Sequence, residues 1–240
     1  MSFVISEQEE VVRLLERASS YDKEVNNRLE NLIKTQDSLL ILLHIFVESQ
    51  NFRVKHAALT FLLRAARNHL ETIEKEQRDI FKELIEANIE RKVASDDQKL
   101  WSSIIAETFR TDPDFWPSLI THLFAMSEAM PYQVGIILRD IVPLMDPVEY
   151  IDQIMVIKDL SSSLFASDDQ ETRISGLSIF CETATYFGED SSLGEFSQNI
   201  TQLAKDSVTF ANTAYTDTWN LIDKLIKNRI SDKFLSSILE

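Results

Sequence analysis

The stretch Phe52–Ala87, FRVKHAALTFLLRAARNHLETIEKEQRDIFKELIEA, decides the fold class of this chain. Its apolar residues recur every three to four positions from Val54 to Ala65 and, after a polar interruption, again from Ile80 to Ile85. This spacing places apolar side chains on one face of an α-helix. The stretch therefore predicts two amphipathic helices that are joined by a short polar loop.

The composition extends this expectation to the whole chain. The 240 residues include only 4 glycines and 5 prolines, and average usage would give roughly three times as many. Because sheet proteins need glycine at their turns, this shortage favours helices with short connections. Hydrophobic residues make up 44 % of the chain, which is enough for a packed core and argues against disorder. We therefore predict an all-α protein.

The predicted helices alternate between two kinds, A and B, along the chain. The A helices are expected to begin near residues 6, 37, 73, 113, 147, 191 and 231, so that the step is 31–44 residues. HEAT and armadillo repeats recur about every 40–47 residues. A helix pair cannot bury its apolar faces alone and therefore stacks on the next pair. We predict a right-handed HEAT-repeat solenoid, and an irregular helical bundle is the alternative.

The predicted array is a single domain over residues 1–240, because no linker rich in glycine, proline or serine divides it. It contains about six helix pairs and the start of a seventh. An array that stops inside a pair suggests a fragment, or a shortened relative of a longer protein.

Capping residues mark several of the expected helix starts. Ser6 opens a Ser-x-x-Glu capping box, and the pair Asp168-Asp169 is a candidate cap for a later apolar run. In the stretch Asp114-Phe115-Trp116-Pro117 we expect Asp114 to be the N-cap. Proline fits there because it loses no hydrogen bond in the first turn of a helix. Trp116 would then form a bulky wedge between neighbouring helices.

The charge and the cysteine content exclude several classes of protein. A net charge of −15 disfavours nucleic acid and anionic membranes as ligands. It favours basic proteins as partners, although solubility alone explains the acidity as well. Cys181 is the only cysteine, so a disulfide framework is impossible and a reducing compartment is expected. No apolar run approaches the roughly 20 residues that cross a bilayer, and residues 1–10 lack the features of a secretory signal.

No sequence motif supports catalysis, a metal site or a cofactor. The histidines His44, His56, His69 and His122 do not have metal-ligand spacing. The phosphate-binding, dinucleotide-binding and nucleophile-elbow motifs of common enzymes do not occur in the chain. Cys181 lies on an apolar face, where a buried inert thiol is expected. We therefore predict a binding protein, and a helical enzyme with an unrecognised site is the alternative.

The opening stretch resembles the second and third HEAT repeats of the importin-β (karyopherin-β) family of nuclear transport receptors. An arginine, two alanines and a leucine on a B helix carry the resemblance, followed by an apolar A helix and a Trp-Pro-x-Leu element that opens the next repeat. These positions are Arg53, Ala57, Ala58, Leu62, Leu84, Ile85, Pro113, Trp116, Pro117, Leu119, Ile120 and Leu123. Their order and spacing resemble an importin N-terminal region over about residues 22–125. Residues 169–187 and 214–240 are similar to later repeats of the beta-3 type of importin, and also to HEAT repeats in general.

The resemblance implies the N-terminal part of a nuclear import receptor. Such receptors bind the GTP-bound form of the small GTPase Ran on the inner face of their first repeats. They bind cargo further along the arch, and phenylalanine-glycine (FG) nucleoporins on the outer surface of the A helices. The implied partners are therefore Ran, FG nucleoporins and basic cargo proteins, in the cytoplasm and the nucleus, including the nuclear pore. Another HEAT-repeat scaffold, such as a phosphatase- or tubulin-associated subunit, is the alternative.

The B helices of a HEAT array line its concave face. Residues opposite the apolar stripe of each B helix are expected to point into that concavity. These candidate Ran-facing residues are Asn27, Asn31, Lys34, His56, Thr60, Leu63, Arg67, Ser95, Lys99, Ser102, Arg110, Gln133, Ile136 and Asp140. Their mixed polarity is typical of a protein-binding surface, and an ordinary solvated helix face would show the same mixture.

Overall fold

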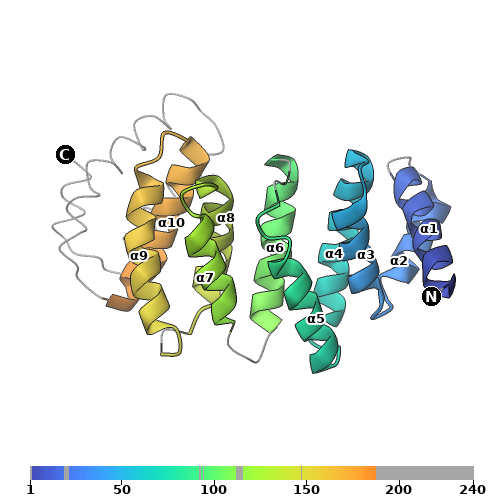
Figure 1. Cartoon of the computed structure of the whole chain (residues 1–240), viewed down its shortest axis with the longest axis horizontal. Coiled ribbons are helices and arrows are strands. Elements are labelled where there is room, and N and C mark those ends of the chain that lie inside the picture. Colours follow the sequence, from blue (N-terminus) through green and yellow to red (C-terminus); the bar gives the residue numbers. More distant parts are fainter. Residues whose placement is uncertain are drawn as a thin grey trace. The chain divides into compact units, whose positions relative to one another are not determined.

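The computed structural model describes residues 2–18, 22–91, 93, 95–111, 116–146 and 148–187. Within these ranges every regular element is helical and no strand occurs (Figure 1). The helices are α1 (Ser2–Arg17), α2 (Lys23–Leu32), α3 (Ser38–Glu48), α4 (Phe52–His69), α5 (Lys75–Glu86), α6 (Ser95–Thr111), α7 (Pro117–Met126), α8 (Pro131–Ile141), the 3₁₀ helix η1 (Val142–Leu144), α9 (Ile151–Phe165) and α10 (Gln170–Phe187). The prediction of an all-α fold is confirmed.

The chain divides into two compact units, Met1–Leu123 and Phe124–Glu240. In the first unit α1 packs against α2, and α3 packs against α4. In the second unit α9 packs against α10. These contacts join A and B helices that the sequence predicts as pairs. α4 also packs against α6, and α8 against α10, so B helices of neighbouring pairs lie side by side within each unit.

The A helices begin close to their expected positions. The starts predicted near residues 37, 73, 113 and 147 are observed at Ser38, Lys75, Pro117 and Ile151. The starts predicted near residues 191 and 231 lie outside the described residues. The periodicity of the sequence therefore locates these four A helices to within a turn or so.

The opening stretch forms α4 and α5, as its apolar spacing predicts. The fully buried residues of the two helices are Val54, Ala58, Leu59, Leu62, Ala65, Phe81 and Ile85. α4 packs against α1, α3 and α6, so it lies in the interior of the first unit. Trp101 of α6 is buried in the same core, where its ring centroid lies 5.2 Å from that of Phe46 on α3.

Asp22 and Asp169 each cap a helix. The Oδ1 atom of Asp22 accepts a hydrogen bond from the backbone N–H of Val25 in α2, at 3.3 Å. This hydrogen bond, together with the Arg17 guanidinium 2.6 Å from the carboxylate, lowers the pKa of Asp22. The Oδ2 atom of Asp169 accepts a hydrogen bond from the backbone N–H of Thr172 in α10, at 2.8 Å. The cap predicted at Asp168-Asp169 is therefore confirmed for Asp169.

Two other predicted helix ends are wrong. α1 begins at Ser2 and continues through Ser6, so the capping box at Ser6 is not a helix start. The apolar spacing of the sequence also predicts a helix over residues 132–145, but α8 ends at Ile141 and is followed by η1. Pro143 lies in η1, and its missing N–H prevents the α-helix from continuing there.

Trp116 lies immediately before α7, which begins at Pro117. The indole is buried, and its N–H donates to the carboxylate of Glu86 in α5. The Lys82 ammonium lies 5.3 Å from the centroid of the indole ring. Trp116 is therefore the expected wedge, although it is not helical, and its contacts with α5 fix the start of α7. The predicted cap Asp114 lies outside the described residues.

α9 and α10 approach each other closely at Gly176. A Cβ atom at this position would lie 2.6 Å from the backbone nitrogen of Phe165 and 2.8 Å from the carbonyl oxygen of Ser161. Side chains do not come so close to other atoms, and backbone atoms cannot rotate away. The glycine therefore allows these two helices to pack backbone against backbone.

We expect Gly176→Ala to destabilise the protein. The methyl group must push α9 away from α10, which costs toward the upper end of about 1–3 kcal/mol and exceeds the roughly 1 kcal/mol gained by replacing glycine within a helix. Thermal unfolding followed by circular dichroism should show a midpoint lower by roughly 4–8 °C. Gly135→Ala is the matched control, since its Cβ would meet side chains and no backbone: Ser175 Cβ at 3.1 Å and Leu164 Cδ1 at 3.8 Å. Equal midpoints for the two variants would contradict the close approach.

A second expectation concerns the start of α10. Asp169→Ala removes the capping hydrogen bond and should lower the free energy of unfolding by about 1 kcal/mol, as measured by urea unfolding. Asp168→Ala removes the same charge from a neighbour that makes no hydrogen bond to the helix among the described residues. This control should change the free energy by less than about 0.5 kcal/mol. If the free energy of unfolding falls by the same amount in both variants, the lost negative charge is the cause and not the lost capping hydrogen bond.

Candidate protein-interaction surface

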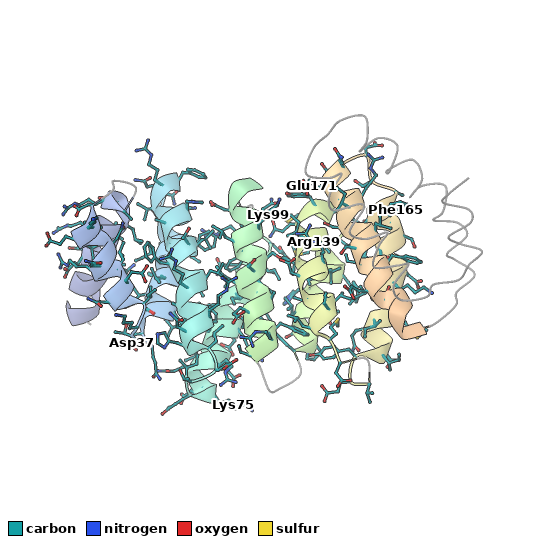
Figure 2. All side chains as sticks on the ribbon, turned by 180° about the vertical axis from the view of Figure 1, so that it is seen from behind. Asp37, Lys75, Lys99, Arg139, Phe165 and Glu171 are labelled. Carbon is teal, nitrogen blue, oxygen red and sulfur yellow. The ribbon has the colours of Figure 1, made fainter. Side chains whose placement is uncertain are left out.

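Most of the predicted partner-facing residues lie at the protein surface. The exposed or half-buried ones are Asn27 and Asn31 on α2, His56, Thr60 and Arg67 on α4, Lys99 and Arg110 on α6, and Asp140 on α8. Figure 2 shows Lys99 on α6. Lys34 is also exposed, but it lies in the turn after α2, where its Nζ donates to Asn31 Oδ1 at 3.1 Å. The side chain of Ser95 lies outside the described part of the structure.

Four residues of the predicted surface are buried instead: Leu63, Ser102, Gln133 and Ile136. They cannot present their side chains to a partner, so the prediction is corrected at these positions. The physical reason is that α4, α6 and α8 are covered on more than one side. α8 shows this most clearly, because it packs against α9, α10 and η1. Its buried residues are Gln133, Val134, Gly135, Ile136, Ile137, Leu138 and Ile141.

Side-chain contacts tie the B helices of the first unit to one another. Arg64 of α4 forms an ion pair with Glu30 of α2. On the other side of α4, His56 Nδ1 lies 2.5 Å from the Oδ1 atom of Asp97 on α6. These two contacts therefore link α4 to α2 and to α6.

The contact between His56 and Asp97 joins an exposed side chain to a buried one. Asp97 is only 2 % exposed, and a buried carboxylate needs a hydrogen-bond donor or a positive charge beside it. The Nδ1–H group of His56 donates to that carboxylate. This hydrogen bond fixes the orientation of the imidazole and leaves its Nε2 atom on the side away from Asp97.

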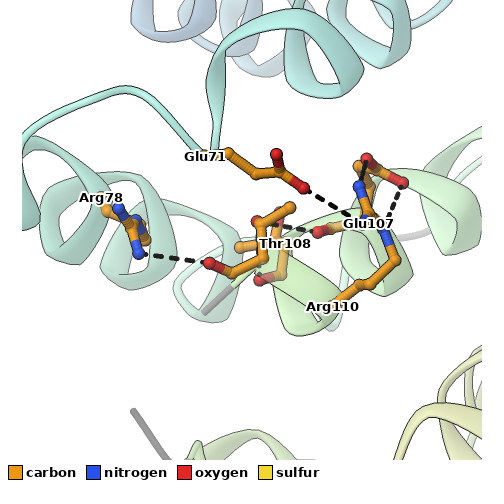
Figure 3. Close-up of polar contacts among 6 residues, drawn as sticks. Glu71, Arg78, Glu107, Thr108 and Arg110 are labelled. Carbon is orange, nitrogen blue, oxygen red and sulfur yellow. Dashed lines mark hydrogen bonds and ion pairs between the residues drawn. The ribbon is translucent and has the colours of Figure 1, made fainter. Parts of the chain in front are cut away.

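Arg110 is exposed, but carboxylates of its own chain surround it (Figure 3). Its guanidinium donates to Glu107 at 2.6 Å and to Glu71 at 3.2 Å. Glu107 is the main cause of the raised pKa of Arg110, and Glu71 adds to it. Nearby, Arg78 of α5 donates to the backbone carbonyl of Thr111 at 3.2 Å. These contacts hold the end of α6 in place, so Arg110 is chiefly a structural residue.

A hollow of about 340 Å³ lies beside the first turns of α4. Its lining residues are Ala18, Phe52, Arg53, His56, Ala57, Thr60 and Phe61, and we call it the Phe52 hollow. The sequence predicted His56 and Thr60 as surface residues but missed Phe52 and Arg53. The spacing of four between Phe52, His56 and Thr60 could have indicated that they share one face of the helix.

The described residues offer no sign of a metal site or a membrane span. Among them, no three His, Cys, Asp or Glu side chains come together in a way that could hold a metal ion. No helix in the described ranges combines the length and the apolar character needed to cross a bilayer. Comparisons with protein-family models, with curated proteins and with solved structures give no match. The function must therefore be inferred from the residues themselves.

We expect His56→Ala to destabilise the first unit. The substitution leaves the buried Asp97 carboxylate without its donor, and an unsatisfied buried polar group costs about 1–3 kcal/mol. Urea unfolding should show this loss in the free energy of unfolding. His44→Ala is the control, because His44 is exposed on α3 and has no hydrogen-bond partner within the described ranges. A loss of the same size in both variants would show that the contact with Asp97 does not stabilise the unit.

Proposed function

We propose that this chain is a HEAT-repeat solenoid of the importin-β type and the N-terminal part of a nuclear import receptor. The observation that carries the proposal is the packing of consecutive B helices, α4 with α6 and α8 with α10. A stacked array of helix pairs needs this contact, because each pair buries its apolar faces on the next. The pattern of Arg53, Ala57 and Trp116-Pro117 favours the importin type over other HEAT scaffolds.

Ran in its GTP-bound form would bind the exposed side chains of α2, α4 and α6. Asn27 and Asn31 offer amide donors and acceptors, and Arg67 and Lys99 offer positive charges. Neither Arg67 nor Lys99 forms an ion pair with another described residue, so both charges are available to a partner. A folded partner contacts several helices at once only if their spacing is fixed, and the two interhelix contacts of α4 maintain that spacing.

FG nucleoporins and cargo would use other surfaces. Ile80 and Leu84 on α5, and Ile151 and Met155 on α9, are exposed apolar pairs that lie one helical turn apart on A helices. Exposed apolar side chains of this kind can accept the phenylalanine rings of FG segments. The net charge of −15 favours basic cargo. The proposal places the protein in the cytoplasm and the nucleus, including the nuclear pore, and assigns it no catalytic activity and no cofactor.

Binding of the full chain to purified Ran tests the proposal. We expect the GTP-loaded form to bind with a Kd of about 1 µM or below, and the GDP-loaded form to bind at least about tenfold more weakly. Isothermal titration calorimetry measures both. Arg67→Glu should weaken binding of the GTP form, because it reverses a charge on the predicted surface. Arg13→Glu makes the same change on α1, where Arg13 is exposed and forms no ion pair with a described residue, and should have little effect.

Two results would contradict the transport function. One is equal binding of both nucleotide forms, and the other is no binding of either form at micromolar protein. Equal losses in Arg67→Glu and Arg13→Glu would contradict the placement of the site on the B helices.

A further inference from the structure

The Phe52 hollow exposes an aromatic side chain that the fold leaves uncovered. Phe52 is 54 % exposed. Burying a large apolar side chain such as phenylalanine stabilises a protein, and the fold does not gain this free energy at Phe52. Phe61 and the methyl groups of Ala18, Ala57 and Thr60 complete an apolar lining. The volume of about 340 Å³ lies at the lower end of the range for ligand pockets. The hollow therefore suits one large side chain and its immediate neighbours.

The walls of the hollow are held in position before any ligand arrives. The Phe52 ring stacks on the His56 ring, with centroids 6.5 Å apart and planes 25° from parallel. His56 is itself fixed by the buried Asp97 carboxylate. On the opposite side, the Arg64 guanidinium lies 5.4 Å from the centroid of the Phe61 ring. A partner would therefore lose little free energy to ordering of the site.

The rim of the hollow carries a positive charge that no described residue neutralises through an ion pair. Arg53 is exposed and forms no ion pair with any residue that the structure describes. Four other arginines of the first unit are paired: Arg17 with Asp22, Arg28 with Glu10, Arg64 with Glu30, and Arg110 with Glu107 and Glu71. Arg13 and Arg67 are unpaired among the described residues, as Arg53 is, but neither lines the hollow. Acidic residues outnumber basic ones by 39 to 24 in this chain, so a free guanidinium beside an apolar hollow indicates a carboxylate on the partner.

We propose that the Phe52 hollow binds a segment of a partner protein in which a large apolar residue stands next to Asp or Glu. The apolar side chain packs between Phe52 and Phe61. The adjacent carboxylate accepts hydrogen bonds from the Arg53 guanidinium. This inference goes beyond the proposed function, because it specifies the chemistry of the bound segment and does not require that the partner be Ran.

Short peptides test the proposal on the full chain. The probes are acetyl-Gly-Phe-Asp-Gly-amide and two analogues, one with Asn in place of Asp and one with Ala in place of Phe. Binding is followed by the amide chemical shifts of residues 52–61 in NMR titrations. We expect saturable shifts with the Phe-Asp peptide, and affinities about fivefold lower for the Phe-Asn and Ala-Asp analogues. Phe52→Ala should weaken binding of both peptides that contain phenylalanine.

The charge is tested with a matched pair of arginine variants. Arg53→Gln should lower the affinity for the Phe-Asp peptide to that of the Phe-Asn peptide and leave the Phe-Asn affinity unchanged. Arg13→Gln removes the same charge from α1, at a residue that does not line the hollow, and should leave both affinities unchanged. Because Arg53 and Arg13 are exposed, neither variant threatens the fold.

Several outcomes would overturn the proposal. They are no saturable shift at about 10 mM peptide, equal affinities for the Phe-Asp and Phe-Asn peptides, and equal losses in the two arginine variants. Sedimentation of the free protein supplies a further check. If the protein self-associates and Arg53→Gln dissociates it, the hollow is a contact between copies of the chain and not a docking site for another protein.

Discussion

The burial of α4 among three other helices is the constraint on which the first unit depends. α4 packs against α1, α3 and α6, and its stripe from Val54 through Leu62 to Ala65 is fully buried. Its solvent-exposed face carries Phe52, Arg53, His56, Arg64, Arg67 and Asn68. Recognition by α4 must therefore use this face, because the buried stripe is committed to the core.

The apolar spacing of the sequence was enough to predict the helices and three of their pairs, α1 with α2, α3 with α4 and α9 with α10, but not the full extent of burial. Residues three and four apart define one stripe, and that stripe locates α4 and its neighbour α3 correctly. Leu63 and Ser102 lie outside the stripes and are nevertheless buried. Their helices, α4 and α6, pack against each other although they belong to different pairs. Such contacts form between segments that are far apart in the chain, so the spacing of apolar residues within one helix does not predict them. The same reason explains why the predicted surface of α8, with Gln133 and Ile136, proved to be interior.

The starts of the helices also depend partly on neighbouring residues in the sequence and partly on residues far away in the chain. The Asp169 cap is a contact between residues three positions apart, so the sequence identifies it. The start of α7 depends instead on Trp116, whose indole donates to Glu86 of α5. The partner stands 30 positions earlier in the chain, and the proline signal alone placed the helix start slightly too early. Capping residues and prolines therefore predict approximately where a helix begins, and a tertiary contact can move the observed start by a few residues.

The arrangement of charge separates structural cations from those that can meet a partner. Arg17, Arg28, Arg64 and Arg110 all pair with carboxylates of the first unit. Exposed pairs of this kind contribute only about 0–1 kcal/mol each to stability. The paired carboxylate nevertheless offsets the positive charge that the arginine would present to a binding partner. Arg53 lacks such a neighbour among the described residues. Because salt screens exposed charges beyond about 8 Å, Arg53 cannot draw an acidic segment from afar against a net charge of −15. In the proposed complex, its contribution would come from the hydrogen bonds to the carboxylate of the bound segment.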